Sequence, residues 1–327
     1  MRTSPLLNRP GAVASAPDDP DGAVPAHLGD PGREQAALAE GRAVCALARD
    51  VVTVAGPDRL SWLTTLSSQV LTGLKPGDGG AETLLLDAQG HITHALAALD
   101  DGRTLWLVTE VGNGEALATF LDSMRFMLRV EVTERPDVMA LGALGEGLEA
   151  LVQAARDTAP DASDSPAEAG DAEPQGSLIG LWRDPWPGVV EGGTSYDVGA
   201  DRPHPGETYR GGFVLVPAQS VNAVVSTFLT AGEGRRLAGA LAWEALRIEA
   251  GRPRWAREAD ARAIPHRLRH AAVIGAASSL AVGEGFDLVA PHVPTPLLNQ
   301  IDQLPFTFKH TLLEAEEGYA RVEILRV

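Results

Sequence analysis

One stretch of the sequence brings together an acid, two arginines and a tryptophan, at Glu249, Arg252, Arg254 and Trp255. A carboxylate can accept two parallel hydrogen bonds from the amidine-like edge of a heterocycle. An arginine fork can bind a carboxylate tail, and an indole can stack on a flat ring. These residue types therefore suit a flat ligand with an acidic tail. A C-capped helix with solvated arginines would account for the same residues, and on these residues alone it is the better interpretation.

A helix that ends in a glycine is expected to position this cluster. Apolar residues before the cluster recur at intervals of three and four, which predicts a helix with one buried face. They are Leu237, Leu241, Ala245 and Ile248. Gly251 can adopt the left-handed conformation that ends a helix, and Pro253 cannot continue one. The chain should therefore turn where the cluster lies.

Three motifs match one known family in their order and spacing. They are residues 247–251 followed by Ile264-Pro265-His266, residues 52–60 followed by Trp62-Leu63 and Ser67-Ser68-Gln69, and residues 84–92. Over about residues 33–266 the chain thus resembles the folate-binding YgfZ family and its relative, the aminomethyltransferase (T-protein) of the glycine cleavage system. The resemblance implies the T-protein-like folate-binding fold.

The same resemblance implies tetrahydrofolate or a related folate as the ligand. Glu249 would pair with the pterin edge, and Arg252 or Arg254 would neutralise the glutamate tail. Trp255 or Trp62 would supply a stacking face. These five residues are the expected folate-binding site.

Two functions follow from the two branches of the resemblance. The YgfZ branch implies a folate-binding protein that assists the maturation or repair of iron–sulfur proteins, which would be its partners. The T-protein branch implies aminomethyl transfer, and it needs an acidic pair at the end of a strand. The matching run, residues 90–95, ends in His94 and Ala95. Binding without catalysis is therefore expected, although Asp87 lies nearby and His94 could exchange protons near neutral pH.

The resemblance stops after His266. The YgfZ family carries a cysteine-containing signature soon after this point, followed by a small β-barrel, and residues 267–280 contain no such string. We expect residues 267–327 to be an atypical or degenerate form of that barrel region. A frameshifted reading frame would also explain the change. A degenerate or frameshifted chain would act only as a protein-interaction module.

Composition narrows the partners and the kinds of site. The formal net charge of −17 argues against nucleic-acid binding, which needs concentrated positive charge. Cys45 is the only cysteine, so the chain forms no internal disulfide and no cysteine-based metal cluster. His266, His270 and His292 have no standard metal-ligand spacing, and no metal site is expected.

Length and patterning predict several packed units. A chain of 327 residues with 44% hydrophobic residues allows two or three of them. Residues 1–32 contain no continuous apolar run, so we expect a disordered arm and neither a signal peptide nor a membrane span. The expected location is the cytoplasm. Residues 158–177 combine acids with Pro, Ala, Ser and Gly, which is typical of a disordered insertion.

The remaining pattern predicts an α+β fold of two sheet-and-helix units, residues 33–135 and 136–266. In the first unit, helices alternate with antiparallel hairpins, which favours a sheet covered by helices on one face. The helices expected there are 35–47, one from 57 onward, and 115–127; the expected strands are 51–54, 82–87, 91–99, 104–109 and 129–133. In the second unit we expect strand 213–217 and helix 221–230 before the helix that ends at Gly251.

Overall fold

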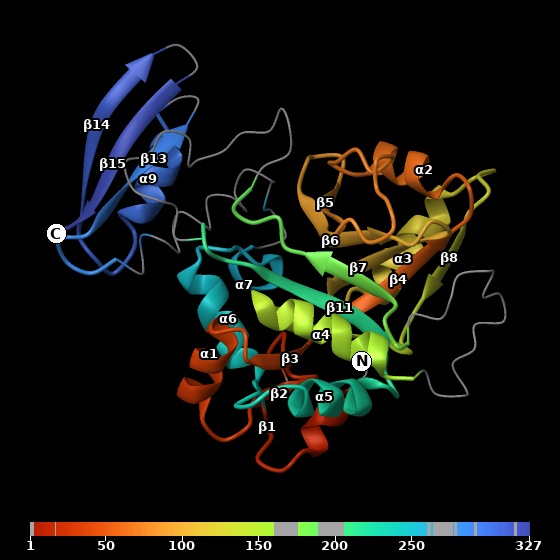
Figure 1. Cartoon of the computed structure of the whole chain (residues 1–327). Helices are drawn as coiled ribbons and strands as arrows, with labels where there is room; N and C mark the ends of the chain where they lie inside the picture. Colours follow the sequence, from red (N-terminus) through yellow and green to blue (C-terminus); the bar gives the residue numbers. More distant parts are fainter. Residues whose placement is uncertain are drawn as a thin grey trace. The chain divides into compact units, whose positions relative to one another are not determined.

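The computed structural model describes residues 3–16, 18–159, 176–188, 206–259, 263, 277, 280–290, 293–316 and 319–327 (Figure 1). The chain divides into two compact units. The first comprises Met1–Asp184 and Arg210–Ala245, and the second comprises Pro185–Tyr209 and Leu246–Val327. Most of the expected insertion, residues 160–175, lies outside the described residues, as does the expected motif at 264–266. Among the described residues, no helix is long and apolar enough to cross a membrane.

The N-terminal residues belong to the core of the first unit, so the expectation of a disordered arm over residues 1–32 is wrong. They form the 3-10 helix η1 (Pro5–Asn8), β1 (Val13–Ala14), β2 (Pro25–His27) and the start of α1 (Pro31–Ala39). Leu6 and Val24 are buried, and the Ser4 N–H donates a hydrogen bond to the Ala23 carbonyl at 2.7 Å. Single apolar residues anchor this segment, and such residues leave no periodic signal in a sequence.

The first of two five-stranded sheets in this unit has the order β5-β6-β7-β4-β8 and is antiparallel throughout. Its strands are β4 (Arg49–Ala55), β5 (Ala81–Leu86), β6 (Ile92–Asp100), β7 (Thr104–Glu110) and β8 (Glu131–Glu134), and its helices are α2 (Arg59–Leu66) and α3 (Gly114–Met124). Val52 and Val54, alternate residues of β4, pack in one core with Leu63 of α2 and Leu117 of α3. Both helices therefore cover the same face of the sheet, which confirms the α+β prediction.

The second sheet has the order β10-β11-β9-β3-β12. Its strands are β3 (Ala43–Leu47), β9 (Val138–Leu144), β10 (Gly180–Arg183), β11 (Gly211–Pro217) and β12 (Arg236–Leu237), and it shares a core with α4 (Glu146–Asp157) and α5 (Val221–Thr230). Strand β12 pairs with β3 in parallel, and the other pairs are antiparallel. The helix expected over 35–47 is wrong for the residues of β3, which form a strand. A short apolar run is compatible with a buried strand or a buried helix, and pairing with β9 makes this run a strand.

Helix α6 (Ala240–Glu249) forms where the sequence predicts it but buries a different face. Leu241 and Ile248 are 50% and 46% exposed, whereas Trp243 and Leu246 are 7% and 8% exposed. Leu237 lies before the helix, in β12. The buried face includes an indole and charged side chains, so the aliphatic stripe alone does not identify it.

The C-terminal residues of the second unit form a three-stranded antiparallel sheet in the order β13-β15-β14. The strands are β13 (Gly285–Ala290), β14 (Phe308–Glu316) and β15 (Tyr319–Arg326), and α9 (Thr295–Ile301) packs against them. Leu288, Ile301 and Ile324 are at most 1% exposed. The described part of residues 267–327 therefore has a packed hydrophobic core of its own.

Candidate functional site

The turn after α6 forms as the sequence predicts. Gly251 has a φ of +64°, in the left-handed region that glycine adopts without steric cost. The Arg252 N–H donates to the Arg247 carbonyl at 2.8 Å, a hydrogen bond typical of a glycine C-cap. The short helix α7 (Trp255–Glu258) begins a few residues later. This cap brings the expected residues Arg252, Arg254 and Trp255 onto one turn.

Three arginines at this turn are buried, contrary to the interpretation of solvated arginines. Arg247, Arg252 and Arg254 are 4%, 9% and 6% exposed. Arg247 donates through Nη2 to Glu258 Oε1 at 2.8 Å and through Nη1 to the Arg252 carbonyl at 3.1 Å. Glu258 Oε2 accepts the Arg254 N–H at 2.7 Å. Buried charges are costly unless they are paired and hydrogen-bonded, so these contacts are part of what holds the turn together.

Sequence reasoning missed two residues of this turn. Glu258 is four positions after Arg254, a spacing at which residues on a helix are neighbours and which could have indicated it. Trp186 is the other: its Nε1 donates to the Ala250 carbonyl at 2.9 Å, and the Arg252 guanidinium lies 5.7 Å from the centre of its ring. This is within the range of a cation–π contact. No local pattern predicts a contact between Trp186 and residue 250.

The other expected ligands occupy different environments. Glu249, the last residue of α6 and the expected partner of the pterin edge, is exposed to solvent. Trp255 is half-buried, and its Nε1 atom is buried without a hydrogen-bond partner among the described residues. Trp62 is 5% exposed and packs in the core of the first unit. Because its indole is buried in this core, Trp62 does not offer the stacking face that the sequence predicts.

The strand that would carry an acidic pair holds a buried histidine instead. His94 of β6 is 7% exposed, and burial lowers its pKa. Asp87 Oδ1 accepts the N–H groups of His91 and Gln89 at 2.8 and 2.9 Å, and Oδ2 lies 2.9 Å from His91 Nδ1. The His91 N–H is the main cause that holds the pKa of Asp87 below its usual range. Asp87 is therefore engaged in the hairpin turn between β5 and β6.

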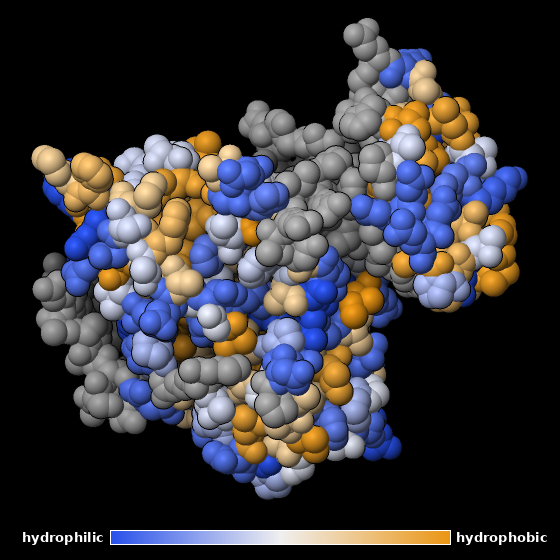
Figure 2. Space-filling model, turned by 180° about the vertical axis from the view of Figure 1, so that it is seen from behind, coloured by the Kyte–Doolittle hydropathy of each residue, from blue (hydrophilic) through white to orange (hydrophobic). Residues whose placement is uncertain are grey.

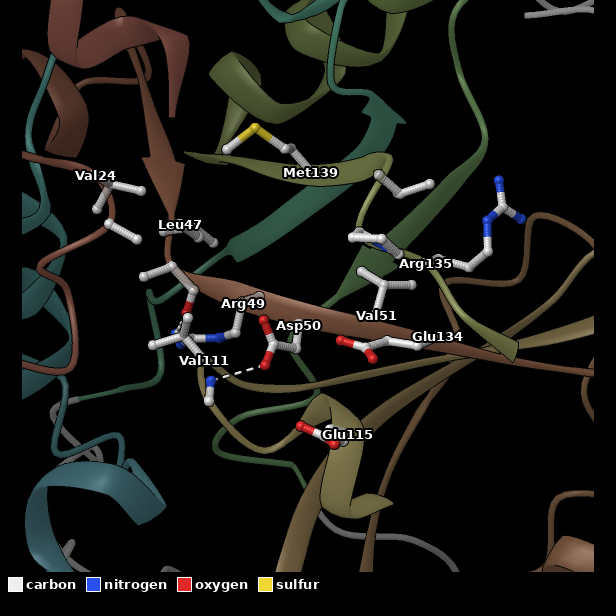
Figure 3. A pocket seen from close by; sticks show the side chains of 15 residues that line it. Val24, Leu47, Arg49, Asp50, Val51, Val111, Glu115, Glu134, Arg135 and Met139 are labelled. Carbon is white, nitrogen blue, oxygen red and sulfur yellow. Dashed lines mark hydrogen bonds between the residues drawn. The ribbon is translucent and has the colours of Figure 1, made fainter. Parts of the chain in front are cut away.

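A hollow of about 230 Å³ lies in the first unit (Figure 3). Its apolar floor includes Val24, Leu47, Val51 and Met139, all of them buried. Its lining includes none of the five expected site residues. Pockets that bind drug-sized molecules typically measure about 300–1,000 Å³. The hollow is therefore below the usual size of a small-molecule pocket.

Carboxylates from three elements surround this hollow (Figure 3). They belong to Asp50 of β4, Glu115 of α3 and Glu134 at the end of β8. Asp50 Oδ2 accepts the N–H groups of Gly112 and Gly114 at 2.7 and 3.0 Å, which fixes its side chain. Glu115 and Glu134 are exposed. The hollow therefore combines an apolar floor with an acidic rim.

The two arginines of the lining have carboxylate partners of their own. Arg49 donates through Nη1 to Glu110 Oε2 at 3.1 Å. Arg135 donates through Nε to Asp137 Oδ1 at 2.9 Å, and its guanidinium lies 4.9 Å from the centre of the Trp106 ring. Each guanidinium of the lining therefore has an acidic partner that lies outside the lining.

Comparison with solved structures identifies the class of fold. The chain has the α+β fold of glycine cleavage aminomethyltransferases. The crystal structure of glycine cleavage system aminomethyltransferase T from Bartonella henselae matches 98% of this chain and 88% of that chain, with a TM-score of 0.56 and 14% sequence identity. At this identity the likeness shows the fold alone. No curated protein sequence matches the chain significantly.

Two further solved structures match less well. One is the regulatory subunit of aspartate kinase from Thermus thermophilus, with a TM-score of 0.32, 13% identity, and coverage of 58% of this chain and 96% of that chain. The other is the heterotetrameric sarcosine oxidase from Corynebacterium sp. U-96, with a TM-score of 0.30, 14% identity, and coverage of 60% of this chain and 90% of that chain.

A family model described as an uncharacterized conserved protein (DUF2249) matches residues 258–326. The match begins before the boundary expected at residue 267, and it includes Ile264, Pro265 and His266, which also form part of the folate-family resemblance. A frameshifted segment is not expected to match a protein family over its length. This match and the packed core of the C-terminal sheet therefore argue against the frameshift explanation, which reading the other frames of the DNA would test.

Proposed function

We propose that the chain binds a reduced folate, as its resemblance to the YgfZ family implies. The aminomethyltransferase fold, which extends over 98% of the chain, is the observation that carries this proposal. The turn after α6 supports it, because buried guanidinium groups and an indole gather at positions that the resemblance assigns to folate. The lining of the hollow in the first unit includes none of the residues that the resemblance assigns to folate, so we place the folate at the turn.

The groups at the turn suit the two ends of a folate. Arg252 or Arg254 would bind the glutamate tail, since a guanidinium fork binds carboxylates well. Trp255 would stack on the pterin, and its Nε1 is a donor without a partner among the described residues. Buried donors are nearly always hydrogen-bonded, so an acceptor atom of a ligand fits this position. Glu249 would accept hydrogen bonds from the pterin edge.

The exposed position of Glu249 allows a test that leaves the fold intact. Glu249→Gln keeps the size of the side chain and removes the charged acceptor. We expect it to weaken tetrahydrofolate binding about tenfold, because hydrogen bonds to charged groups are the stronger ones. Calorimetric titration measures the affinity. Glu233→Gln, which changes another exposed acid, is the matched control and should bind like the parent. Unchanged affinity in Glu249→Gln would remove Glu249 from the site.

A second variant separates stacking from hydrogen bonding at Trp255. Trp255→Phe keeps an aromatic face and removes the indole N–H. Weaker binding in this variant, together with a further loss in Trp255→Ala, is expected if the indole contributes both contacts. Identical affinities in the parent and in both variants would place the folate elsewhere.

The proposal also includes assistance to iron–sulfur proteins. This assistance would not use a cysteine of this chain as a reactive group. Cys45 is buried, its Sγ lies 3.6 Å from the Gly142 carbonyl, and burial raises the pKa of its thiol. Cells that lack the chain should lose activity of their iron–sulfur enzymes. The parent and a Cys45→Ala variant should both restore this activity, whereas Glu249→Gln should restore less of it.

Aminomethyl transfer is the second candidate, and the likeness to an aminomethyltransferase fold favours it. The position of the required acidic pair holds His94 and Ala95, and His94 is buried with a lowered pKa. Neither residue supplies a carboxylate beside a reacting amine. Folate binding without formation of a methylene-folate product supports the first proposal, and catalytic formation of that product would decide for the second.

A further inference from the structure

The C-terminal sheet has a long edge strand that the proposed folate site does not use. Strand β14 lies at one end of the order β13-β15-β14, so within the described residues it pairs with β15 on one side only (Figure 1). With nine residues it is longer than any other edge strand that the structure describes. The backbone groups on the outer side of an edge strand are a template for pairing with another strand.

The side chains of β14 are open to solvent along its second half. Residues 312–316 are all exposed, and Leu312 and Leu313 are 52% and 44% exposed. Figure 2 shows hydrophobic residues beside hydrophilic ones on the surface of the C-terminal sheet. Lys309 is exposed too, and no ion pair in the described part of the chain involves Lys309 or Glu316. The edge strand therefore offers apolar side chains together with charges of both signs.

A β-bulge divides β14 into two halves. The residues before and after Leu313 are opposite Val322 and Arg321, which are neighbours in β15, so Leu313 is one extra residue. Residues opposite each other in paired strands share a face of the sheet. The residues of β14 that are opposite 319, 321, 323 and 325 therefore share one face. They are Lys309, Thr311, Glu314 and Glu316.

This set of residues is symmetric about the bulge. A second copy of β14 that runs antiparallel, with the two bulges side by side, places Lys309 opposite Glu316 of the second copy. Thr311 is then opposite Glu314 of the second copy. Each pair joins residues of the same face, as a strand ladder requires. The lysine–glutamate pair occurs twice by symmetry, and opposite charges across two strands stabilise their pairing.

We propose that two copies of the chain associate through β14, which joins their C-terminal sheets into one continuous sheet with a two-fold axis at the bulge. A contact of this kind uses the same surface on both copies and closes at the dimer. The exposed leucines of the bulge meet near the axis. Stable interfaces of standard size involve about 20–30 residues a side, and this strand offers nine. The dimer is therefore weak and depends on protein concentration.

A strand of unrelated sequence fits this edge less well. Lysines and bulges on edge strands commonly prevent pairing with other chains. Against a regular strand, the extra residue Leu313 would shift the register and bring side chains of different faces opposite each other. A second copy carries the same bulge at the same place, and it carries an acid opposite Lys309. The features that disfavour other strands therefore favour a copy of β14 itself.

Sedimentation velocity of the full chain tests the proposal with charge variants. Lys309→Glu places two acids opposite each other in the dimer, and Glu316→Lys places two lysines opposite each other. The double variant Lys309→Glu, Glu316→Lys exchanges the charges and restores both pairs. Lys75→Glu and Glu233→Lys change the net charge equally at exposed residues outside β14, and they are the matched controls. Equal thermal unfolding of the parent and all variants verifies the fold.

Across a concentration range of about a hundredfold, the parent and both controls should pass from monomer to dimer. Each single variant in β14 should dimerise about tenfold more weakly or worse, because two attractive pairs become repulsive. The double variant should dimerise like the parent. An equimolar mixture of Lys309→Glu and Glu316→Lys should form mixed dimers, because every cross-strand pair in them joins a lysine with a glutamate.

Several results would overturn the proposal. One is a monomeric parent over the whole range. Growth beyond dimers would overturn it by assigning the edge to β13 of another copy, since that contact extends a sheet without closing it. Single variants that dimerise as tightly as their controls, or a double variant that does not regain the dimer, would place the contact outside β14.

Discussion

At the scale of single residues, Gly56 marks a close approach of two backbone segments between β4 and α2. Its φ is +114°, and a Cβ atom there would overlap with the Arg129 carbonyl oxygen. Gly56→Ala should lower the free energy of unfolding by about 2 kcal/mol or more, because backbone strain and steric overlap add. Urea denaturation measures the change. Gly77→Ala, where φ is +79° and the space is open, is the control and should lose only about 1 kcal/mol. Equal losses would contradict the close approach.

Burial of His94 should make stability depend on pH. Burial lowers the pKa of His94 from its ordinary value of 6.5. The unfolded chain therefore binds a proton at a pH where the folded chain does not. The contribution of His94 to the free energy of unfolding is complete above about pH 6.5 and is lost as the pH falls below it. His94→Leu should reduce the fall in unfolding free energy between about pH 6.5 and pH 5, measured by urea denaturation at each pH. If the unfolding free energy falls equally with pH in the parent and in the variant, other groups cause the pH dependence.

Sequence reasoning finds the local parts of the candidate site and misses the distant ones. The cap at Gly251 and the grouping of Arg252 with Trp255 follow from glycine and proline chemistry within a few residues. The hydrogen bond from Trp186 to the Ala250 carbonyl joins residues 64 positions apart, and no periodicity carries that information. The exposure of Glu249 depends on which face of α6 is buried. That face is set by packing rather than by the helical repeat.

At the scale of elements, Glu258 links α7 to the end of α6. Glu258→Gln should lower the free energy of unfolding by about 1–3 kcal/mol, because it weakens the hydrogen bond to the buried Arg247 guanidinium and the one to the Arg254 N–H. Differential scanning calorimetry measures the loss. Glu249→Gln, at an exposed acid of the same turn, is the matched control and should change stability little. A loss as small in Glu258→Gln as in the control would contradict a structural role for this carboxylate.

The sequence predicts elements well where periodicity or β-rich composition is strong. Helix α3 forms close to the expected residues because apolar positions recur along one face, and strands β4 and β7 do so because their short runs rich in β-branched and aromatic residues lie between turn signals. Strand β3 is a continuous apolar run that is compatible with a strand or a helix, and its pairing with β9 makes it a strand. The N-terminal segment is held by isolated residues such as Leu6, whose burial comes from the rest of the first unit. Such tertiary contacts are outside the reach of local patterns.

At the scale of the whole molecule, the folate-family resemblance ends where the chain matches another family model. The missing cysteine signature coincides with residues 258–326, which match a different family model. Their described part has its own sheet, with Leu288 and Ile324 in its core. The likeness to the aminomethyltransferase structure still extends over 98% of the chain. The chain therefore combines the expected fold with a C-terminal region that the resemblance alone did not predict.

Titration of the full chain with tetrahydrofolate tests the central proposal most directly. Calorimetry should show saturable binding of one folate per chain, with a dissociation constant below about 100 µM, a free energy of roughly −5 kcal/mol or better. The same titration of Glu249→Gln should give a weaker constant at the same stoichiometry. No saturable binding of the parent up to about 1 mM folate would contradict the proposal. That result would favour a module that acts only through protein contacts.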